Sequence, residues 1–478
     1  MERDRRPKPK VGYYGASLAA YWPQFPGIRE KVEASMDRHV AKLTELGCEV
    51  VRGPLVDKAE MSNDVGDMFN RAGVDIVLGD IMTYTASHVI VPIAQRLRVP
   101  HLTLALQTVP TIDYESATTE DLTWFCVSMS APEVSCAFNR CNLPYHCVVG
   151  GDFQESTWKR IDDWIQAAAT KRALANARFG YLGHYYPGML DMYTDFTMHQ
   201  GQVGAHIEIL EMDDLAARVE EITEAEVDAK VEETRAMFHM PPPGYDRITE
   251  KVNPEDLRWA ARVAVAEDRL VADFDLDGLA YYYRGLNDNL FERIGAAMIL
   301  GNSFLTARGI PCAGEADLKT CVAMFIQEHF GAGGSFCELY LLDYENGIVI
   351  AGHDGPGHIA IGDEKPILRG MKLFHGKSGA GVSVEFSVKH GPVTLLGVTQ
   401  TGEGKLKLVA AEGESVPGPI LQIGNTNTRV KFALPPGEFG QRWAETGSTH
   451  HFALGVGHQL SKIEKLAKLL DLELEVVC

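Results

Sequence analysis

Residues 74–106, VDIVLGDIMTYTASHVIVPIAQRLRVPHLTLAL, contain two apolar runs separated by a helical pattern. The runs VDIVLGDI (74–81) and PHLTLAL (100–106) have the length and apolar content of buried strands, and SHVIVPIAQRLR (87–98) has helical spacing. A strand, a helix and a second strand in this order predict a βαβ unit, in which the two strands are parallel. Ligands of such sheets bind at the carboxyl ends of the strands.

The same alternation continues on both sides of this unit. KVGYYG (10–15) and CEVVRGPLV (48–56) have the pattern of strands, and residues 27–47 between them have that of a helix. A long helix is expected at 156–177, and RFGYLGHYYPGMLDMY (178–193) then opens a second α/β stretch. No GxGxxG motif follows the first strand, so a dinucleotide site has little support.

The composition changes at about residue 331, where the chain becomes rich in glycine and β-forming residues. Stretches such as 333–353 and 426–434 alternate and turn in the manner of an antiparallel sheet. The sequence therefore predicts two Rossmann-like parallel-sheet α/β domains followed by a mostly antiparallel β domain. The expected boundaries are 1–175, 176–330 and 331–478.

Composition excludes several classes of function. A net charge of −20 argues against nucleic-acid binding, which requires a basic surface. No apolar run approaches the roughly 20 residues that span a bilayer. The basic N-terminus, MERDRRPKPK, has no apolar segment behind it, so we expect a solvated tail and a cytoplasmic protein. Nine cysteines without a CxxC pair predict reduced thiols.

Carboxylates and imidazoles stand among glycines or at strand ends in the C-terminal half: Glu315, Glu338, His353, His450 and His451. Two carboxylates with two imidazoles make a mixed oxygen and nitrogen set that suits Mn²⁺, Co²⁺ or Mg²⁺. Neighbouring side chains of an extended run point to opposite faces, so only one histidine of the adjacent pair is expected to bind the ion. Each residue also has a plainer interpretation, such as a helix-start glutamate or a turn histidine.

Five short segments occur in a characteristic order: AGEADLKT (313–320), GGSFCELY (333–340), IVIAGH (348–353), EKPIL (364–368) and GSTHH (447–451). In these segments the chain resembles the L-arabinose isomerase family, within the L-fucose/L-arabinose isomerase group, and the likeness extends over nearly the whole chain. The resemblance implies one divalent ion, usually Mn²⁺, held by Glu315, Glu338, His353 and His451.

The resemblance also implies an activity, the interconversion of an aldose and a ketose through a cis-enediol. Glu315 and Glu338 would exchange the proton between C2 and C1, with the identity of the base left open. His450 would face the substrate. The family forms hexamers or tetramers whose active site includes the N-terminal domain of a neighbouring subunit, so a homo-oligomer with an interface site is expected.

The expected substrate pocket departs from the family. Ser17 stands in a turn where the family has a glutamine, and Tyr282 belongs to a YYYRG strand that replaces a threonine-rich one. Gln107 and Tyr84 do match a family glutamine and aromatic residue. We predict that these four residues contact a sugar, which is another pentose, a hexose or a modified sugar if it is not L-arabinose. Hydrogen bonds to sugar hydroxyls set specificity strongly, so changed residues imply changed specificity.

Two other functions remain open at the level of sequence. One is an epimerase or lyase that uses the same metal-stabilised enediol on a related polyol, which product analysis would distinguish. The other is a sugar-binding or regulatory protein that kept the fold without catalysis. A complete metal set argues against the second, because binding alone does not need two carboxylates beside a metal.

Overall fold

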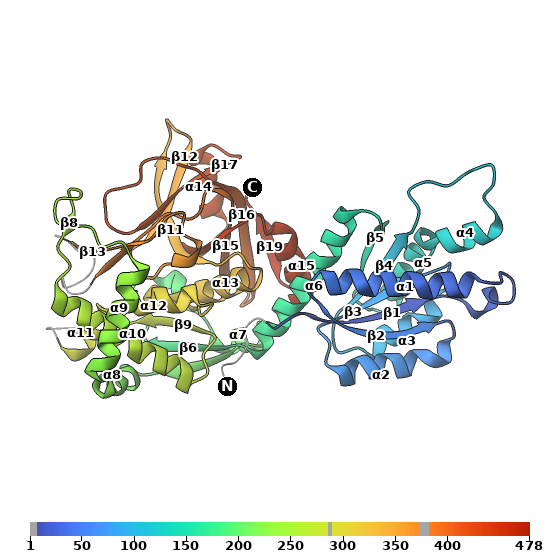
Figure 1. Ribbon diagram of the computed structural model, residues 1–478, viewed down its shortest axis with the longest axis horizontal. Helices are drawn as coiled ribbons and strands as arrows, with labels where there is room; N and C mark the ends of the chain where they lie inside the picture. Colours follow the sequence, from blue (N-terminus) through green and yellow to red (C-terminus); the bar gives the residue numbers. More distant parts are fainter. Residues whose placement is uncertain (1–6, 285–288, 372–381) are drawn as a thin grey trace. The chain divides into compact units, whose positions relative to one another are not determined.

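The computed structural model describes residues 7–284, 289–371 and 382–478 (Figure 1). The chain separates into two compact units, which end and begin at Arg172 and Ala173. This boundary falls inside the long helix α6 (Glu155–Asn176). Each unit is described by itself below.

The first unit is built on a five-stranded parallel sheet in the order β2-β1-β3-β4-β5. Its strands are β1 (Lys10–Ala16), β2 (Glu49–Val56), β3 (Ile76–Ile81), β4 (His101–Gln107) and β5 (His146–Gly151). Its other helices are η1 (Ala19–Tyr21), α1 (Ile28–Glu45), η2 (Ala59–Met61), α2 (Ser62–Ala72), η3 (Ser87–Val89), α3 (Val91–Arg96), α4 (Thr119–Phe125) and α5 (Val127–Arg140).

One face of this sheet packs against α2, α3 and α5. Tyr14 and Val77 on the strands share a buried cluster with Phe69, Ile93 and Phe138 on those helices. The three central strands, β1, β3 and β4, are almost wholly buried, as expected for a parallel sheet whose faces are covered by helices.

The second unit begins with a four-stranded parallel sheet in the order β10-β9-β6-β7. Its strands are β6 (Arg178–Gly183), β7 (His206–Leu210), β9 (Gly278–Tyr282) and β10 (Cys312–Ala313). The accompanying helices are η4 (Leu190–Met192), α7 (Phe196–Val203), α8 (Met212–Glu221), α9 (Glu224–Met237), α10 (Pro254–Asp273), α11 (Leu290–Gly295), α12 (Met298–Ala307), η5 (Gly314–Ala316) and α13 (Leu318–His329).

The rest of this unit is a mostly antiparallel sheet in the order β15-β18-β11-β12-β17-β16-β19, and β15 also pairs with β16. That extra pairing closes six of the strands on themselves, which leaves only β19 outside the ring. The strands are β11 (Ser335–Asp343), β12 (Ile348–His353), β15 (Gly391–Gln400), β16 (Leu406–Ser415), β17 (Thr426–Phe432), β18 (His451–Val456) and β19 (Glu473–Val476). Three short strands form a separate sheet: β8 (Thr249–Glu250), β13 (Ile367–Met371) and β14 (Ser383–Glu385). The remaining helices are η6 (Ile359–Ile361), α14 (Pro436–Glu445) and α15 (Leu460–Leu470).

The predicted fold class is confirmed, because both α/β sheets are parallel and the last sheet is mostly antiparallel. A single hydrophobic cluster runs from Leu182 on β6 through α10 and α12 to Val430 on β17, so the second unit contains both predicted downstream sheets. The three-domain division stays a prediction. Residues 289–309, whose spacing is helical throughout, form two helices, because α11 ends at Gly295 and α12 begins at Met298.

The structure also bears on membrane insertion. Across the described ranges, none of the helices combines the length and the apolar character that a bilayer crossing requires.

Candidate metal centre

The register of the antiparallel sheet places two of the predicted ligands face to face. Glu338 on β11 lies directly opposite His451, the first residue of β18. Residues opposite one another in an antiparallel pair project from the same face of the sheet. The third ligand, His353, ends the strand on the other side of β11. The sheet therefore gathers one carboxylate and two imidazoles at one end.

Glu315 reaches the same place from the parallel sheet of this unit. It lies in η5, directly after β10, and so at the carboxyl end of that sheet. Glu315 and Ala316 both have positive φ, 56° and 58°, which side chains other than glycine rarely adopt. Such strain persists only where the surroundings enforce it, and it is common at functional sites.

The imidazoles converge on the Glu315 carboxylate. His451 Nε2 lies 3.7 Å and His450 Nε2 lies 3.9 Å from Glu315 Oε2, and His353 Nε2 lies 4.0 Å from Glu315 Oε1. One atom each of Glu315, His450 and His451 lie within 4.8 Å of one another, and the same holds for Glu338, His353 and His451. All five residues singled out from the sequence thus meet, with His451 common to both groups.

Two atoms of the cluster show that it suits a cation. Glu315 Oε2 and His451 Nε2 are buried, and neither has a hydrogen-bond partner among the residues that the structure describes. Buried polar atoms without partners are costly and rare. A carboxylate oxygen and an imidazole nitrogen are both ligands of divalent metals such as Mn²⁺. The donor set therefore fits a bound divalent ion.

An aspartate carboxylate contacts the Nδ1 atom of each of the two adjacent histidines. His451 Nδ1 lies 3.1 Å from Asp317 Oδ2, and both residues are fully buried. His450 Nδ1 lies 2.6 Å from Asp191 Oδ2, and Asp191 also accepts the backbone N–H of His450 at 3.1 Å. A proton held at Nδ1 leaves the Nε2 lone pair of each ring available to a metal or a substrate.

His353 has a different arrangement at Nδ1. The backbone N–H of Gly355 donates to His353 Nδ1 at 3.0 Å, and Asp354 Oδ1 lies 3.4 Å from the same nitrogen. With Nδ1 accepting a hydrogen bond, a neutral ring carries its proton on Nε2. In the other tautomer the Nδ1 proton faces Asp354 Oδ1, and the Nε2 lone pair is then available to a metal. Phe336, which is fully buried, packs against the His353 and His451 rings at centroid distances of 4.5 and 4.3 Å.

Electrostatics distinguish the carboxylates of the cluster. Burial raises the pKa of Glu315, and the neighbouring imidazoles His451 and His450 only partly offset it. The hydrogen bond from His450 lowers the pKa of Asp191 well below its ordinary value. Burial alone would raise the pKa of Asp317, but its hydrogen bond with His451 and the charge of Lys319 lower it. Asp191 and Asp317 are thus anionic where they contact Nδ1 of His450 and of His451.

Of the predicted substrate contacts, Tyr282 lies in the same unit as the cluster. It ends β9, and its ring packs against Tyr186 at a centroid distance of 4.8 Å. The backbone N–H of Tyr186 donates to the carbonyl of Glu315 at 3.3 Å, so this aromatic pair adjoins the candidate ligand.

Ser17, Tyr84 and Gln107 belong to the first unit. They follow or end β1, β3 and β4, and carboxyl ends of parallel strands share one edge of a sheet. Ser17 is fully buried, and its hydroxyl is hydrogen-bonded to Thr83 at 2.5 Å. The role of these residues in substrate binding stays a prediction.

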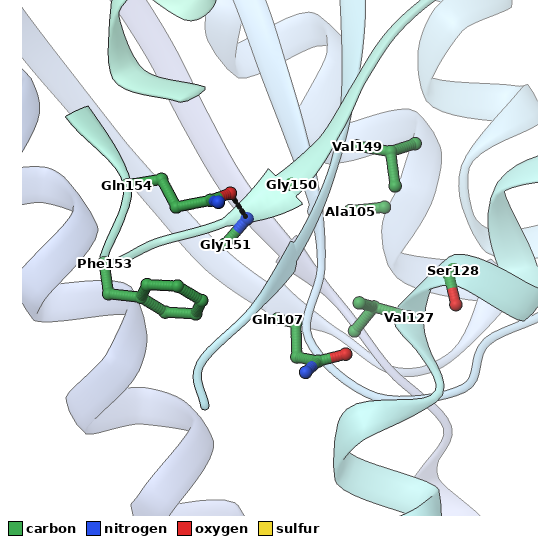
Figure 2. A pocket seen from close by; sticks show the side chains of 9 residues that line it. All are labelled: Ala105, Gln107, Val127, Ser128, Val149, Gly150, Gly151, Phe153 and Gln154. Carbon is green, nitrogen blue, oxygen red and sulfur yellow. Dashed lines mark hydrogen bonds between the residues drawn. The ribbon is translucent and has the colours of Figure 1, made fainter. Parts of the chain in front are cut away.

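Gln107 also lines a pocket of about 260 Å³ in the first unit (Figure 2). The pocket lies at the carboxyl ends of β4 and β5, next to the start of α5. The side-chain amide nitrogen of Gln107, Nε2, donates to the carbonyl of Val109 at 2.7 Å. The side chain of Gln154 accepts the backbone N–H of Gly151 at 3.0 Å. Two side-chain amides, the Phe153 ring and several small or apolar residues line this pocket.

Sequence reasoning missed Asp191, Asp317 and Tyr186. Asp317 had a detectable signal, because it caps α13 and lies two residues after Glu315. Asp191 had none, since it lies 259 positions before His450. Their roles depend on contacts between elements that are distant in the chain.

The chain is similar to known sugar isomerases. Residues 333–473 match the model of the L-arabinose isomerase C-terminal domain. The chain is 23% identical over 331 residues to a sulfoquinovose isomerase of Alkalicoccus urumqiensis, which covers 69% of this chain and 71% of that protein. It is 23% identical over 342 residues to an L-arabinose isomerase of Shigella boydii serotype 18, with 70% and 67% covered.

A solved structure of a periplasmic solute-binding protein from Actinobacillus succinogenes with bound D-allose is 13% identical and covers 64% of this chain and 78% of its own. Its TM-score of 0.16 is too low to support an argument. The matched C-terminal domain contains Glu338, His353 and His451, three of the four predicted metal ligands. The chain is therefore similar to L-arabinose isomerases, most specifically in residues 333–473, and the relatives named here are sugar isomerases.

Proposed function

We propose that the protein is a metal-dependent sugar isomerase that interconverts an aldose and a ketose through a cis-enediol. The observation that carries this proposal is the pair of buried atoms, Glu315 Oε2 and His451 Nε2, which lack hydrogen-bond partners within the described residues and lie 3.7 Å apart. The names of the relatives, all isomerases of sugars, support the class of reaction.

The proposed ligands of the ion are Glu315, Glu338, His353 and His451. Mn²⁺ is the proposed ion, with Co²⁺ and Mg²⁺ as alternatives that accept the same donors. When bound, the ion polarises the carbonyl and hydroxyl oxygens of an open-chain sugar as a Lewis acid. Asp317 holds the His451 ring so that Nε2 remains available.

The two glutamates carry the proposed proton transfer. One carboxylate removes the proton from C2 of the aldose while O1 gains a proton, which gives the cis-enediol. O2 then loses its proton as the C2-derived proton is returned at C1, which leaves a hydroxyl on C1 and a ketone at C2. Either Glu315 or Glu338 can serve as the base. His450, held by Asp191 and about one-third exposed, is the proposed contact to a sugar hydroxyl.

The substrate is proposed only as a sugar. The two relatives are named for different sugars, sulfoquinovose and L-arabinose. Tyr282 is proposed to line the sugar site of this unit, and Ser17, Tyr84 and Gln107 to contact the sugar from the first unit of a neighbouring copy. This arrangement calls for a homo-oligomer, a hexamer or tetramer, and we propose that it acts in the cytoplasm.

A panel of aldoses and ketoses tests the function. Purified protein is incubated with each sugar and Mn²⁺ in D₂O, and products are identified by NMR before and after EDTA. We expect one aldose–ketose pair to interconvert, with the activity abolished by EDTA and restored by Mn²⁺. Sugar fragments or an epimer would instead indicate a lyase or an epimerase. Absence of any conversion, with no Mn²⁺ binding, would refute the proposal.

A further inference from the structure

The turn of residues 354–358 leaves β12 directly after His353 and is anchored at its far end. The backbone N–H of Gly357 donates to Ser303 Oγ on α12 at 3.2 Å. The backbone N–H of His358 donates to Ser335 Oγ at 3.3 Å, and Ser335 begins β11, the strand that carries Glu338. The end of the turn is therefore tied to a helix and to a second ligand-bearing strand.

The His358 side chain adds a third anchor. Its Nε2 lies 2.9 Å from Glu328 Oε2 on α13, and the two residues are only 5% and 6% exposed. The ring packs so closely on Gly333 that a Cβ there would lie 3.2 Å from His358 Nε2. A buried pair of this kind stabilises a fold little by itself, because desolvation offsets its attraction. Its effect is to hold the ring, and with it the turn, in one position.

The near end of the turn meets the candidate ligand. Gly355 donates its backbone N–H to His353 Nδ1 at 3.0 Å, and Asp354 Oδ1 lies 3.4 Å from that nitrogen. The placement of the turn thus decides which group faces Nδ1, and hence how the His353 ring presents Nε2. Partners of this kind commonly change metal affinity by about 10- to 100-fold when they are lost.

We propose that His358 and Glu328 are positioning residues of the metal centre: their buried contact fixes the turn that orients His353. This inference rests on the metal site of the proposed function. It assigns to His358 a role that its position in a glycine-rich turn does not reveal. Neither residue belongs to the candidate ligand groups.

Two substitutions of Glu328 separate position from charge. Glu328→Asp keeps the charge but withdraws the carboxylate by about 1.5 Å, the length of one carbon–carbon bond. Glu328→Gln keeps the reach and the hydrogen bond but removes the charge. We expect Glu328→Asp to weaken Mn²⁺ binding about tenfold and Glu328→Gln to bind within about threefold of the wild type. Affinity is measured by titration calorimetry of the full chain with Mn²⁺ alone.

Asp363→Ala is the control, because it removes the 3.1 Å partner of the more exposed His390 in the same unit. We expect this variant to bind Mn²⁺ as the wild type does. Thermal melts of the metal-free proteins confirm that each variant is folded at the temperature of the titration. Mn²⁺ affinity of Glu328→Asp equal to that of the wild type overturns the inference. A wild-type protein that binds no Mn²⁺ overturns the proposed function instead.

Discussion

His451 and Asp317 lie 3.1 Å apart, Nδ1 to Oδ2, and are both excluded from solvent. The carboxylate is itself fixed, since its Oδ2 also accepts the Thr320 hydroxyl at 2.7 Å and its Oδ1 accepts the Thr320 N–H at 3.1 Å. Asp317 thus sets both the tautomer and the direction of the candidate ligand ring.

Loss of this carboxylate should weaken metal binding. We expect Asp317→Ala to reduce Mn²⁺ affinity by about 10- to 100-fold, because the His451 ring loses the partner that keeps Nε2 available. Titration calorimetry with Mn²⁺ measures the change. Unaltered affinity in a folded Asp317→Ala protein would show that Phe336 and the strand alone orient the ring.

Metal removal should lower stability through the same cluster. An ion that binds only the folded state stabilises it by about 2.7 kcal/mol at 100 times its dissociation constant. We expect EDTA to lower the melting temperature of the wild type. Glu315→Gln should abolish activity and show little response to EDTA, because it replaces a ligand carboxylate by an amide. Differential scanning calorimetry with and without Mn²⁺ compares the two proteins, and an equal EDTA response in both would exclude Glu315 as a ligand.

Glu267 on α10 should destabilise the protein at neutral pH. It is fully buried, and both its carboxylate oxygens lack hydrogen-bond partners among the described residues. Burial raises its pKa well above the ordinary value, with Asp268 adding to the rise and Lys230 opposing it. The folded state therefore keeps a proton that the unfolded chain releases above about pH 4.5, so stability falls as pH rises beyond that value.

Glu267→Gln removes this dependence. We expect the variant to be more stable than the wild type by about 1–3 kcal/mol at pH 8, with a smaller difference at pH 5. Urea unfolding at the two pH values measures both. The amide fits only if the close packing on Gly301 is kept, since a Cβ at that glycine would lie 1.8 Å from Glu267 Oε2. A constant difference between the two pH values would contradict the assignment.

His39 on α1 should stabilise the first unit in its protonated form. Its Nδ1 lies 2.7 Å from Asp80 Oδ2 and its Nε2 lies 3.3 Å from Asp152 Oδ2. Burial by itself lowers the pKa of His39, but the charges and hydrogen bonds of the two aspartates outweigh it and raise the pKa to about 9.

The sign of the pH effect follows from this raised pKa. The contribution is complete below the unfolded pKa of about 6.5, is lost as pH rises through about 9, and amounts to no more than about 3 kcal/mol. We expect His39→Gln to be less stable than the wild type at pH 6 and to differ less at pH 9.5. Chemical unfolding followed across this range tests the trend, and a difference that grows with pH would be incompatible with it.

Much of the fold could be predicted because its signals are local. The alternation of residues 74–106 is a property of neighbouring residues, and it led to parallel strands β3 and β4. The glycine-rich alternation after residue 331 likewise led to an antiparallel sheet. The break between α11 and α12 has no local signal, because apolar spacing continues across the glycine that ends the first helix.

The sequence by itself determined the residue types of the candidate centre, since Glu315, Glu338, His353 and the His450–His451 pair stand in recognisable short motifs. Only the tertiary structure decided which carboxylate contacts Nδ1 of His450 and which contacts Nδ1 of His451. Asp191 and Asp317 precede their histidines by 259 and 134 positions, and no local pattern couples residues so far apart. Their contacts arise when the carboxyl end of a parallel sheet packs against one end of an antiparallel one, which leaves Nε2 of His451 buried beside Glu315.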